Sequence, residues 1–443
     1  MAKKLILLSI PGLRHKDLSS MPKLCGLTDA GSFATLQPSF PCVTCPVQAN
    51  MTTGKRPDGH GVVANGFFWR DKGQVEMWTS PNDCIDSPQI WDLISHHPDE
   101  PTSAVWFPLH SKMSEADYVC TPAPIHNPDG SESLWCYTRP QELYGELRDE
   151  LGHFPLQHFW GPMANIKGSS WIADSAAVAA GRWQPDFFYI YLPHLDYAAQ
   201  SQGPDSPAAA EAVTALDEVI GKMATEMAEA YADDDVLWLI AGEYAITPVD
   251  HVTYPNRVLR DAGLLRVVEK EDGEHLDPVG SKAWAMVDHQ FSHVFVADAD
   301  PTITAQVADL FRGQEGIAEV LTGQQIIRYE LDHDRSGEVI LISTPNSWQA
   351  YYWWQSDDRA PGYARTVDIH RKPGYDPVEM HIDMSTKSIP LDATLIKGSH
   401  GAPAGDGSQK TVLLTSDASV LPEEVVDDVD VFGMVMRYFG LEG

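Results

Sequence analysis

The densest run of residues able to do chemistry lies between Phe40 and Asn65 and reads FPCVTCPVQANMTTGKRPDGHGVVAN. Within it, Thr44 precedes a helix-like segment, Val47–Thr53. The N-terminus of a helix carries free N–H groups and a partial positive charge, which favour an alkoxide or a phosphoryl oxygen. The pattern therefore indicates a hydroxyl nucleophile at Thr44, with a helix-capping threonine as the alternative.

Four further motifs follow this segment: PQIWDLI, FYIYLPHLDYAAQSQGP, VLWLIAGEYAI and IKGSHGAP. Together, over residues 4–253 and 392–443, the motifs resemble the nucleotide pyrophosphatase and type I phosphodiesterase branch of the alkaline phosphatase superfamily. The resemblance implies that Thr44 is the nucleophile and that Asn65, 21 positions later, holds a phosphate oxygen. It also implies an α/β fold with an alkaline-phosphatase-like core, whose central, mostly parallel sheet lies between helices, and an inserted cap subdomain.

Members of this branch hold two Zn²⁺ ions with three Asp and three His side chains, because two metals clamp the attacking and leaving oxygens. The resemblance places these six ligands at Pro11, Asp196, Gln200, Glu243, Tyr244 and His400. Of these, Asp196 and His400 keep the family's residue type, whereas a proline has no side-chain ligand atom. We therefore expect one divalent ion, with zinc as the candidate, bound by Asp196, Glu243 and His400. Gln200 and Tyr244 are then left to bind the substrate.

Two further groups of residues each allow two interpretations. The sequence DHQFSH places Asp288, His289 and His293 within six residues, as metal ligands or as surface or capping histidines. Cys42 and Cys45 have CxxC spacing, which is typical of a thiolate or redox pair, but they are also expected as small buried side chains.

Another candidate substrate surface is the aromatic run WQAYYWWQ at 348–355, followed by Arg365 and His370. Aromatic faces stack on a base or sugar, and basic groups clamp a phosphate or carboxylate. The alternative is a strand of core aromatics followed by basic residues that offset an acidic surface. His194, two residues before Asp196, is a further candidate ligand or acid.

Short apolar runs alternate with helical patterns, which predicts α/β architecture with a largely parallel sheet. In such sheets ligands bind beyond the carboxyl ends of the strands, where the candidate residues collect. We assign residues 1–264 and 378–443 to the core, and residues 265–377 to an inserted, substrate-facing cap. The expected strands are Lys4–Ile10, Ala104–Phe107, Phe187–Leu192, Val236–Ala241 and Thr411–Leu414, and the expected helices are Pro207–Ala232 and Pro255–Ala262.

The chain of 443 residues carries 31 Lys and Arg against 63 Asp and Glu, a formal net charge of −32. This charge repels nucleic acid and anionic membrane surfaces. We find no apolar run of about 18 residues, as a membrane span needs, and no export signal. The six cysteines are sparse, so we expect a cytoplasmic protein with reduced thiols.

These features predict a phosphoric ester hydrolase that uses Thr44 on a small phosphorylated metabolite. The replaced ligand positions leave two alternatives open. One is a catalytically inactive relative that binds an anionic metabolite. The other is a one-metal or metal-free enzyme of altered chemistry.

Overall fold

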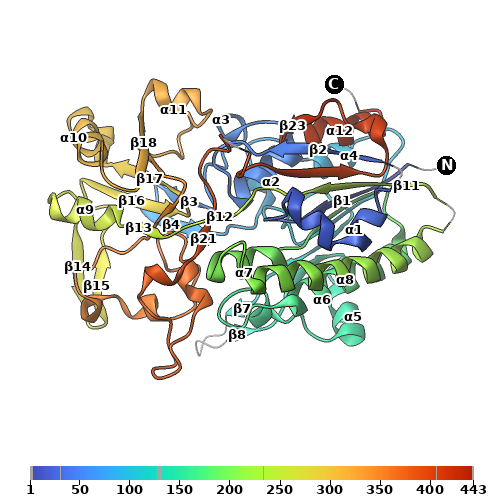
Figure 1. The fold of residues 1–443 in the computed structure, drawn as a ribbon, viewed down its shortest axis with the longest axis horizontal. Helices are drawn as coiled ribbons and strands as arrows, with labels where there is room; N and C mark the ends of the chain where they lie inside the picture. Colours follow the sequence, from blue (N-terminus) through green and yellow to red (C-terminus); the bar gives the residue numbers. More distant parts are fainter. Residues whose placement is uncertain (1–2, 30, 127–131, 233, 406, 442–443) are drawn as a thin grey trace.

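The computed structural model describes residues 3–29, 31–126, 132–232, 234–405 and 407–441. These residues form two lobes, each with its own sheet and its own hydrophobic core (Figure 1). We call the part with the nine-stranded sheet, on the right in Figure 1, the core lobe. The part with the four-stranded sheet, on the left, is the second lobe.

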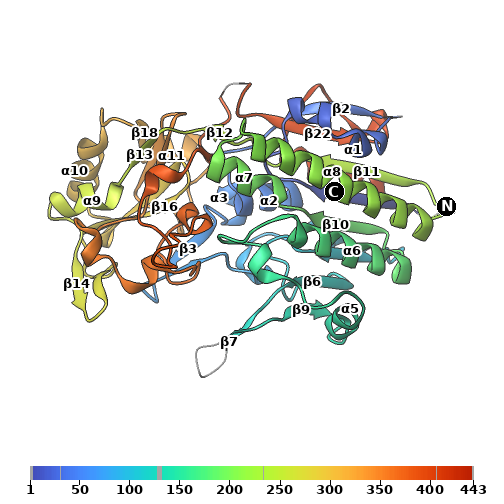
Figure 2. The same cartoon turned by 60° about the horizontal axis from the view of Figure 1, so that its bottom comes forward.

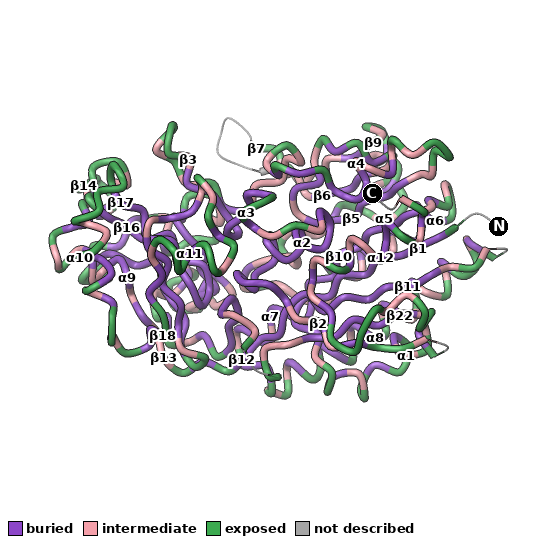
Figure 3. The backbone as a smooth tube through the Cα atoms, turned by 90° about the horizontal axis from the view of Figure 1, so that it is seen from above, coloured by how far each residue is buried: buried purple, intermediate pink, exposed green. Residues whose placement is uncertain are grey.

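The sheet of the core lobe is mixed but mostly parallel. In spatial order its strands are β23 (Val425–Asp427), β2 (Ser32–Gln37), β22 (Thr411–Thr415), β11 (Val236–Ala241), β1 (Lys4–Ser9), β10 (Phe187–Tyr191), β5 (Ser103–Trp106), β6 (Tyr118–Pro122) and β9 (Cys136–Arg139). The pairs at its centre, β5–β10, β10–β1 and β1–β11, are all parallel. Figure 3 shows that the tube is buried along these central strands, as expected for apolar runs covered on both faces. The predicted α/β class with a mostly parallel sheet is confirmed.

Helices cover both faces of this sheet. Those of the core lobe are α1 (Pro22–Gly26), α2 (Thr44–Thr53), α3 (Pro57–His60), α4 (Ile90–Ile94), α5 (Leu143–Leu151), α6 (Ile166–Trp183), α7 (His194–Gln202), α8 (Pro207–Ala230) and α12 (Asp430–Phe439). Helices α6, α7 and α8 pack together on one face, and α2, α4 and α12 lie on the other (Figure 1, Figure 2). Helix α8 starts at Pro207, and Ser206 Oγ accepts a hydrogen bond from the Ala209 N–H at 3.1 Å.

The second lobe is built on an antiparallel sheet. In spatial order its strands are β16 (Ala283–Asp288), β17 (Phe291–Val296), β19 (Val339–Ser343) and β18 (Ile317–Thr322), and its helices are α9 (Pro255–Asp261), α10 (Pro301–Phe311) and α11 (Gln324–Arg328). Its core also includes Phe40, Val63, Val249 and Ile396. The lobe is therefore larger than the stretch 265–377, because segments on both sides of that stretch complete its core.

Short strand pairs complete the fold: β3 (Gly66–Trp69) with β4 (Gln74–Met77), β7 (Ile125–His126) with β8 (Glu132–Ser133), β12 (Thr247–Pro248) with β21 (Gly398–Ser399), β13 (His251–Thr253) with β20 (Ser347–Gln349), and β14 (Val267–Lys270) with β15 (Gly273–Leu276). Strand β20 starts the aromatic run at 348–355. Its five aromatic side chains are at most 1% exposed and pack in the core of the second lobe. The core interpretation of these aromatics fits this packing, and an open ligand wall does not.

The strands and helices named from the sequence are present, with ends that differ by at most two residues. Helix α2 is the functionally important difference, because it begins at Thr44 itself and not at Val47. The carboxyl ends of β1, β10 and β11 lead to Pro11, α7 and Glu243. The turn between β16 and β17 approaches these ends, and the Gln290 N–H donates to the His400 carbonyl at 3.0 Å. Both lobes therefore contribute to one site.

Candidate active site

Thr44 lies buried at the first turn of α2. Val43 occupies the N-cap position, so Thr44 does not cap the helix. Its side-chain Oγ1 lies 2.9 Å from the hydroxyl of Tyr244, and the residue is 4% exposed. The threonine hydroxyl is therefore bonded to another site residue and not to the first turn of its own helix.

Asn65 ties this first turn to the second lobe. Its Oδ1 accepts a hydrogen bond from the Cys45 N–H at 2.9 Å. Its backbone N–H and its Nδ2 donate to the Asp288 carboxylate at 2.7 and 3.1 Å. The same carboxylate lies 2.6 Å from His289 Nδ1. Nδ2 carries a second hydrogen besides the one that it donates to Asp288, and the role of Asn65 toward a phosphate oxygen stays a prediction.

Asp196 and Gln200 lie four residues apart on α7, hence on one face of that helix. Gln200 Nε2 donates to Asp196 Oδ2 at 2.8 Å, and the Tyr375 hydroxyl donates to Gln200 Oε1 at 2.9 Å. Burial raises the pKa of Asp196 to about 7, and the polar groups of Gln200 and Tyr244 oppose this rise.

Glu243 follows β11 in a left-handed conformation, with φ of 54°. Its Oε1 accepts hydrogen bonds from Ser9 Oγ and, at 2.9 Å, from Gln48 Nε2. Gln48 in turn accepts from the Leu109 N–H at 2.9 Å. Burial raises the pKa of Glu243 to about 8. This rise favours the neutral form of the side chain at pH 7. The residue is also held in a strained backbone position of the kind that clusters at functional sites.

Four aromatic rings form a column between the lobes. The ring of Tyr244 stacks on His400 at 3.8 Å, His400 lies 3.9 Å from His289, and His289 stacks on Tyr375 at 3.7 Å between centroids. His400 Nδ1 lies 2.8 Å from the Cys42 carbonyl and donates to it, so Nε2 is the acceptor nitrogen of a neutral ring. That Nε2 lies 3.8 Å from Asp196 Oδ1.

Three buried atoms of this cluster lack a hydrogen-bond partner within the described part of the chain: Asp196 Oδ1, Glu243 Oε2 and His400 Nε2. No group of three or more His, Cys, Asp or Glu side chains among the described residues is arranged to hold a metal ion. Pro11 offers no ligand atom, and Gln200 and Tyr244 are engaged with protein partners. The donor set therefore does not fit the two-zinc centre implied by the resemblance. Asp196 Oδ1 and His400 Nε2 lie 3.8 Å apart, and the single ion with Glu243 as third ligand remains a prediction.

The other predicted residues are separated from this cluster to different degrees. His289 joins it, whereas His293 lies in the core of the second lobe with its ring nitrogens near Val63 O and Gly337 N at 3.0 and 3.1 Å. Arg365 and His370 are exposed, and Arg365 donates to the carbonyl of Asp357 at 3.2 Å. The contacts described for Arg365 do not join it to Thr44, so its role toward a substrate stays a prediction, as does that of His370.

The remaining candidates are buried neutral groups. Burial raises the pKa of the Cys42 and Cys45 thiols, so both stay protonated, which suits small core side chains better than thiolate ligands. His194 is 8% exposed, and burial lowers its pKa to about 4. Its Nδ1 has no partner among the residues that the structure describes.

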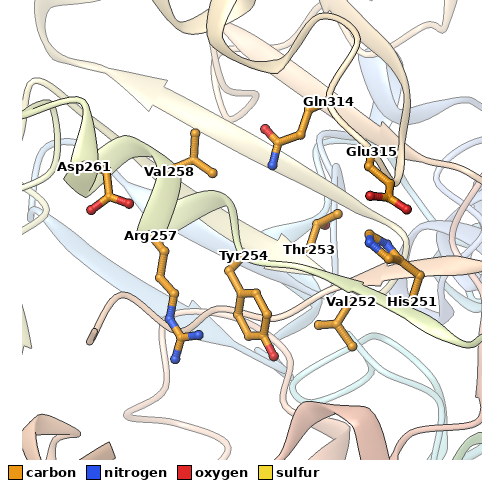
Figure 4. Close-up of a pocket in the computed structure, with 9 residues that line it drawn as sticks. All are labelled: His251, Val252, Thr253, Tyr254, Arg257, Val258, Asp261, Gln314 and Glu315. Atoms are coloured by element: carbon orange, nitrogen blue, oxygen red, sulfur yellow. The ribbon is translucent and has the colours of Figure 1, made fainter. Parts of the chain in front are cut away.

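A separate pocket of about 300 Å³ opens in the second lobe (Figure 4). It contains none of the site residues discussed so far. Its lining consists of His251, Val252, Thr253, Tyr254, Arg257, Val258, Asp261, Gln314 and Glu315.

A family model described as type I phosphodiesterase / nucleotide pyrophosphatase matches residues 5–376. The chain belongs to the type I phosphodiesterase / nucleotide pyrophosphatase family. It is thus a member of a family of phosphoric ester hydrolases, as predicted. An uncharacterised pyrophosphatase/phosphodiesterase of Schizosaccharomyces pombe is 24% identical over 262 residues, which are 57% of this chain and 46% of that protein. The match thus spans less than half of the length of this relative.

Solved structures with the same fold include murine ectonucleotide pyrophosphatase/phosphodiesterase 5, at 13% identity and a TM-score of 0.63 over 99% of this chain and 96% of that one. An inactive threonine-to-alanine variant of the murine protein in complex with AMP gives the same values. Phosphonoacetate hydrolase from Sinorhizobium meliloti 1021, in complex with phosphonoformate, has 15% identity and a TM-score of 0.64 over 99% of this chain and 96% of that one. The predicted alkaline-phosphatase-like fold is confirmed. No helix in the described ranges is long and apolar enough to cross a membrane.

Three site residues escaped the sequence analysis: Ser9, Gln48 and Tyr375. Ser9 ends β1, and Gln48 lies four residues after Thr44 on α2, so both positions were readable once the site was placed at the strand ends. Tyr375 lies outside the regular helices and strands, and no spacing pattern marks it.

Proposed function

We propose that the protein hydrolyses a phosphoric ester of a small metabolite, with the hydroxyl of Thr44 as nucleophile. The observation that carries this proposal is the position of Thr44 Oγ1, at the N-terminus of α2 and 2.9 Å from the Tyr244 hydroxyl. The inactive threonine-to-alanine variant of the murine relative, solved with AMP, supports a threonine in this role.

In this reaction the Thr44 oxygen bonds to phosphorus while the bond between phosphorus and the leaving oxygen breaks. Water then cleaves the phosphothreonine. The proton of Thr44 passes along its hydrogen bond to Tyr244 as Tyr244 passes its own hydroxyl proton to the carboxylate of Asp196, and the leaving oxygen takes its proton from water. The free Nδ2 hydrogen of Asn65 and the N-terminus of α2 favour the charge that develops on the phosphoryl oxygens. Burial raises the pKa of Glu243 to about 8, which favours its neutral form at pH 7 and so weakens its repulsion of an anionic substrate.

The test compares wild type with Thr44→Ala, Thr44→Ser and Thr53→Ala on phosphomonoesters, AMP-containing phosphodiesters and phosphonoacetate. Thr53 lies on the same helix and bonds the Ala49 carbonyl at 2.7 Å, so it is the matched control. We expect Thr44→Ala to lower turnover by about 10³-fold or more, because a nucleophile acts as a unit with its neighbours. Thr44→Ser should retain measurable turnover, and Thr53→Ala should match wild type. Turnover that is unchanged in Thr44→Ala would contradict the proposal.

A second candidate is a binding protein without turnover. Pro11, Gln200 and Tyr244 favour it, because these residues replace ligands that the family uses for catalysis. In that case AMP or phosphonoformate would raise the melting temperature, while no compound of the panel would be turned over.

A further inference from the structure

Three of the positions that correspond to the family's metal ligands, Gln200, Glu243 and Tyr244, have hydrogen-bond partners in the protein, whereas Asp196 Oδ1 and His400 Nε2 have none among the described residues. One chain of hydrogen bonds runs from the Tyr375 hydroxyl to Gln200 and from Gln200 to Asp196, at 2.9 and 2.8 Å. The amide of Gln200 thus donates to a carboxylate oxygen from the position where the family has a histidine ligand. An amide oxygen is a poor zinc ligand, and here it already accepts the Tyr375 proton.

A second set of hydrogen bonds holds Glu243. Its Oε1 accepts from Ser9 and Gln48, and Gln48 is fixed by the Leu109 N–H at 2.9 Å. The carboxyl group is completely buried. Two donors therefore occupy Oε1, and Oε2 is the one oxygen of this carboxyl group without a hydrogen-bond partner among the described residues.

Tyr244 makes the third substitution. Its hydroxyl bonds to Thr44 Oγ1, and its ring lies flat on His400 at 3.8 Å. A neutral phenol supplies a hydrogen bond to the nucleophile but has no charge for a divalent cation. Tyr244 thus connects Thr44 to His400 by a hydrogen bond and a ring contact.

The segment that carries Tyr375 is fixed independently. Lys372 Nζ lies 2.8 Å from Asp376 Oδ2 and 2.6 Å from Glu379 Oε1, and all three side chains are at most 2% exposed. Trp160 Nε1 donates to Glu379 Oε2 at 2.6 Å. A buried, hydrogen-bonded ionic group of this kind favours one arrangement of the chain around it. It therefore keeps the Tyr375 side chain at hydrogen-bond distance from Gln200.

We infer that hydrogen bonds among its own side chains replace the metal centre in this protein, so that the Thr44 site forms without a metal ion. Gln200 and Tyr244 occupy the former ligand positions, and Tyr375 from the second lobe completes the network. The structural part of this inference is independent of turnover. The expectation that turnover is also metal-independent rests on the proposed function.

The deciding measurement is metal content by elemental mass spectrometry. Untagged wild type and an Asp196→Ala/His400→Ala double variant are incubated with Zn²⁺, Mn²⁺ or Mg²⁺ and then desalted. We expect wild type and the double variant to retain nearly equal amounts of metal, with a difference well below one equivalent. The melting temperature of wild type should be the same with metal and with EDTA. If both proteins retain the same amount of metal, that metal is bound outside the site of Asp196 and His400, and the result supports the inference. About one equivalent retained by wild type and lost in the double variant would overturn it.

Activity separates this inference from the proposed function. Thr44-dependent turnover that survives EDTA supports both. Turnover that EDTA abolishes and metal restores overturns the inference but leaves the proposed function standing. If no compound is turned over, the proposed function fails, and the metal content of wild type still decides the inference.

A restored variant tests the cause. The quadruple change Pro11→Asp, Gln200→His, Glu243→Asp and Tyr244→His rebuilds the family's ligand types. We expect this variant to retain zinc that wild type does not. A folded quadruple variant without zinc would contradict the assignment of metal exclusion to these four positions, and the wild-type measurement stands if the variant does not fold.

Discussion

Two buried polar regions touch helix α2, and they differ in how completely they satisfy their hydrogen bonds. We call the first the region behind α2, and it is centred on Asp428. Asp428 accepts hydrogen bonds from the Ser39 N–H at 2.9 Å and from Asn50 Nδ2 at 2.7 Å. Asn50 Oδ1 lies 2.7 Å from His60 Nε2, and His60 Nδ1 accepts from the Val62 N–H at 3.0 Å.

We call the second the front region, and it contains the candidate active site. Three of its residues, Asp196, Glu243 and His400, each have one buried atom without a partner among the described residues. Buried polar atoms are almost always paired where their role is to hold a fold. The contrast indicates that the region behind α2 holds the helix in place, whereas the front region keeps polar atoms that are available to pair with a ligand.

The largest expected difference is in stability. Asp428→Ala leaves Ser39, Asn50 and the Val429 N–H without their acceptor, so we expect it to lower the free energy of unfolding by about 3–5 kcal/mol. Asp196→Ala breaks one hydrogen bond, from Gln200, and should cost about 1 kcal/mol. Unfolding in urea measures both variants. Equal losses would remove the distinction between the two regions.

The sequence predicts several residues of the front region, but not the hydrogen bonds that connect them to their partners. Thr44, Asn65, Asp196 and His400 were found because the motifs keep a fixed order, and the strands were found because buried parallel strands are continuous apolar runs. The partners of these residues were not readable. Tyr375 reaches the site through the packing of the second lobe, and no local pattern in the sequence marks it. Asp288 was named only as a possible metal ligand, and its hydrogen bonds to Asn65 depend on the same packing.

The pH dependence of the free energy of unfolding tests the region behind α2. Burial lowers the pKa of His60 to about 3, whereas the unfolded chain binds this proton near pH 6.5. The unfolded state therefore binds more protons as pH falls below 6.5, and the stability that neutral His60 contributes is lost progressively in that range. At pH 5 the loss is about 2 kcal/mol.

The variant His60→Gln keeps a donor for Asn50 but does not titrate. We therefore expect its stability relative to wild type to improve by about 2 kcal/mol between pH 7.5 and pH 5, as measured by urea unfolding at both values. A pH-independent difference would show that His60 is not held neutral by the network behind α2.

The smallest expected effect tests whether the front region gains from the second lobe. Tyr375→Phe removes the hydroxyl that donates to Gln200 Oε1 but keeps the ring that stacks on His289. A neutral buried hydrogen bond contributes about 1 kcal/mol, so the free energy of unfolding should fall by about that amount. Tyr329→Phe is the matched control, because its hydroxyl bonds Glu319 at an exposed position and should change stability by less than about 0.5 kcal/mol. If Tyr375→Phe is as stable as the control, the link from Tyr375 to Gln200 does not support the site. In that case the second lobe contributes to the site through Asp288 and His289, and not through the Tyr375 hydroxyl.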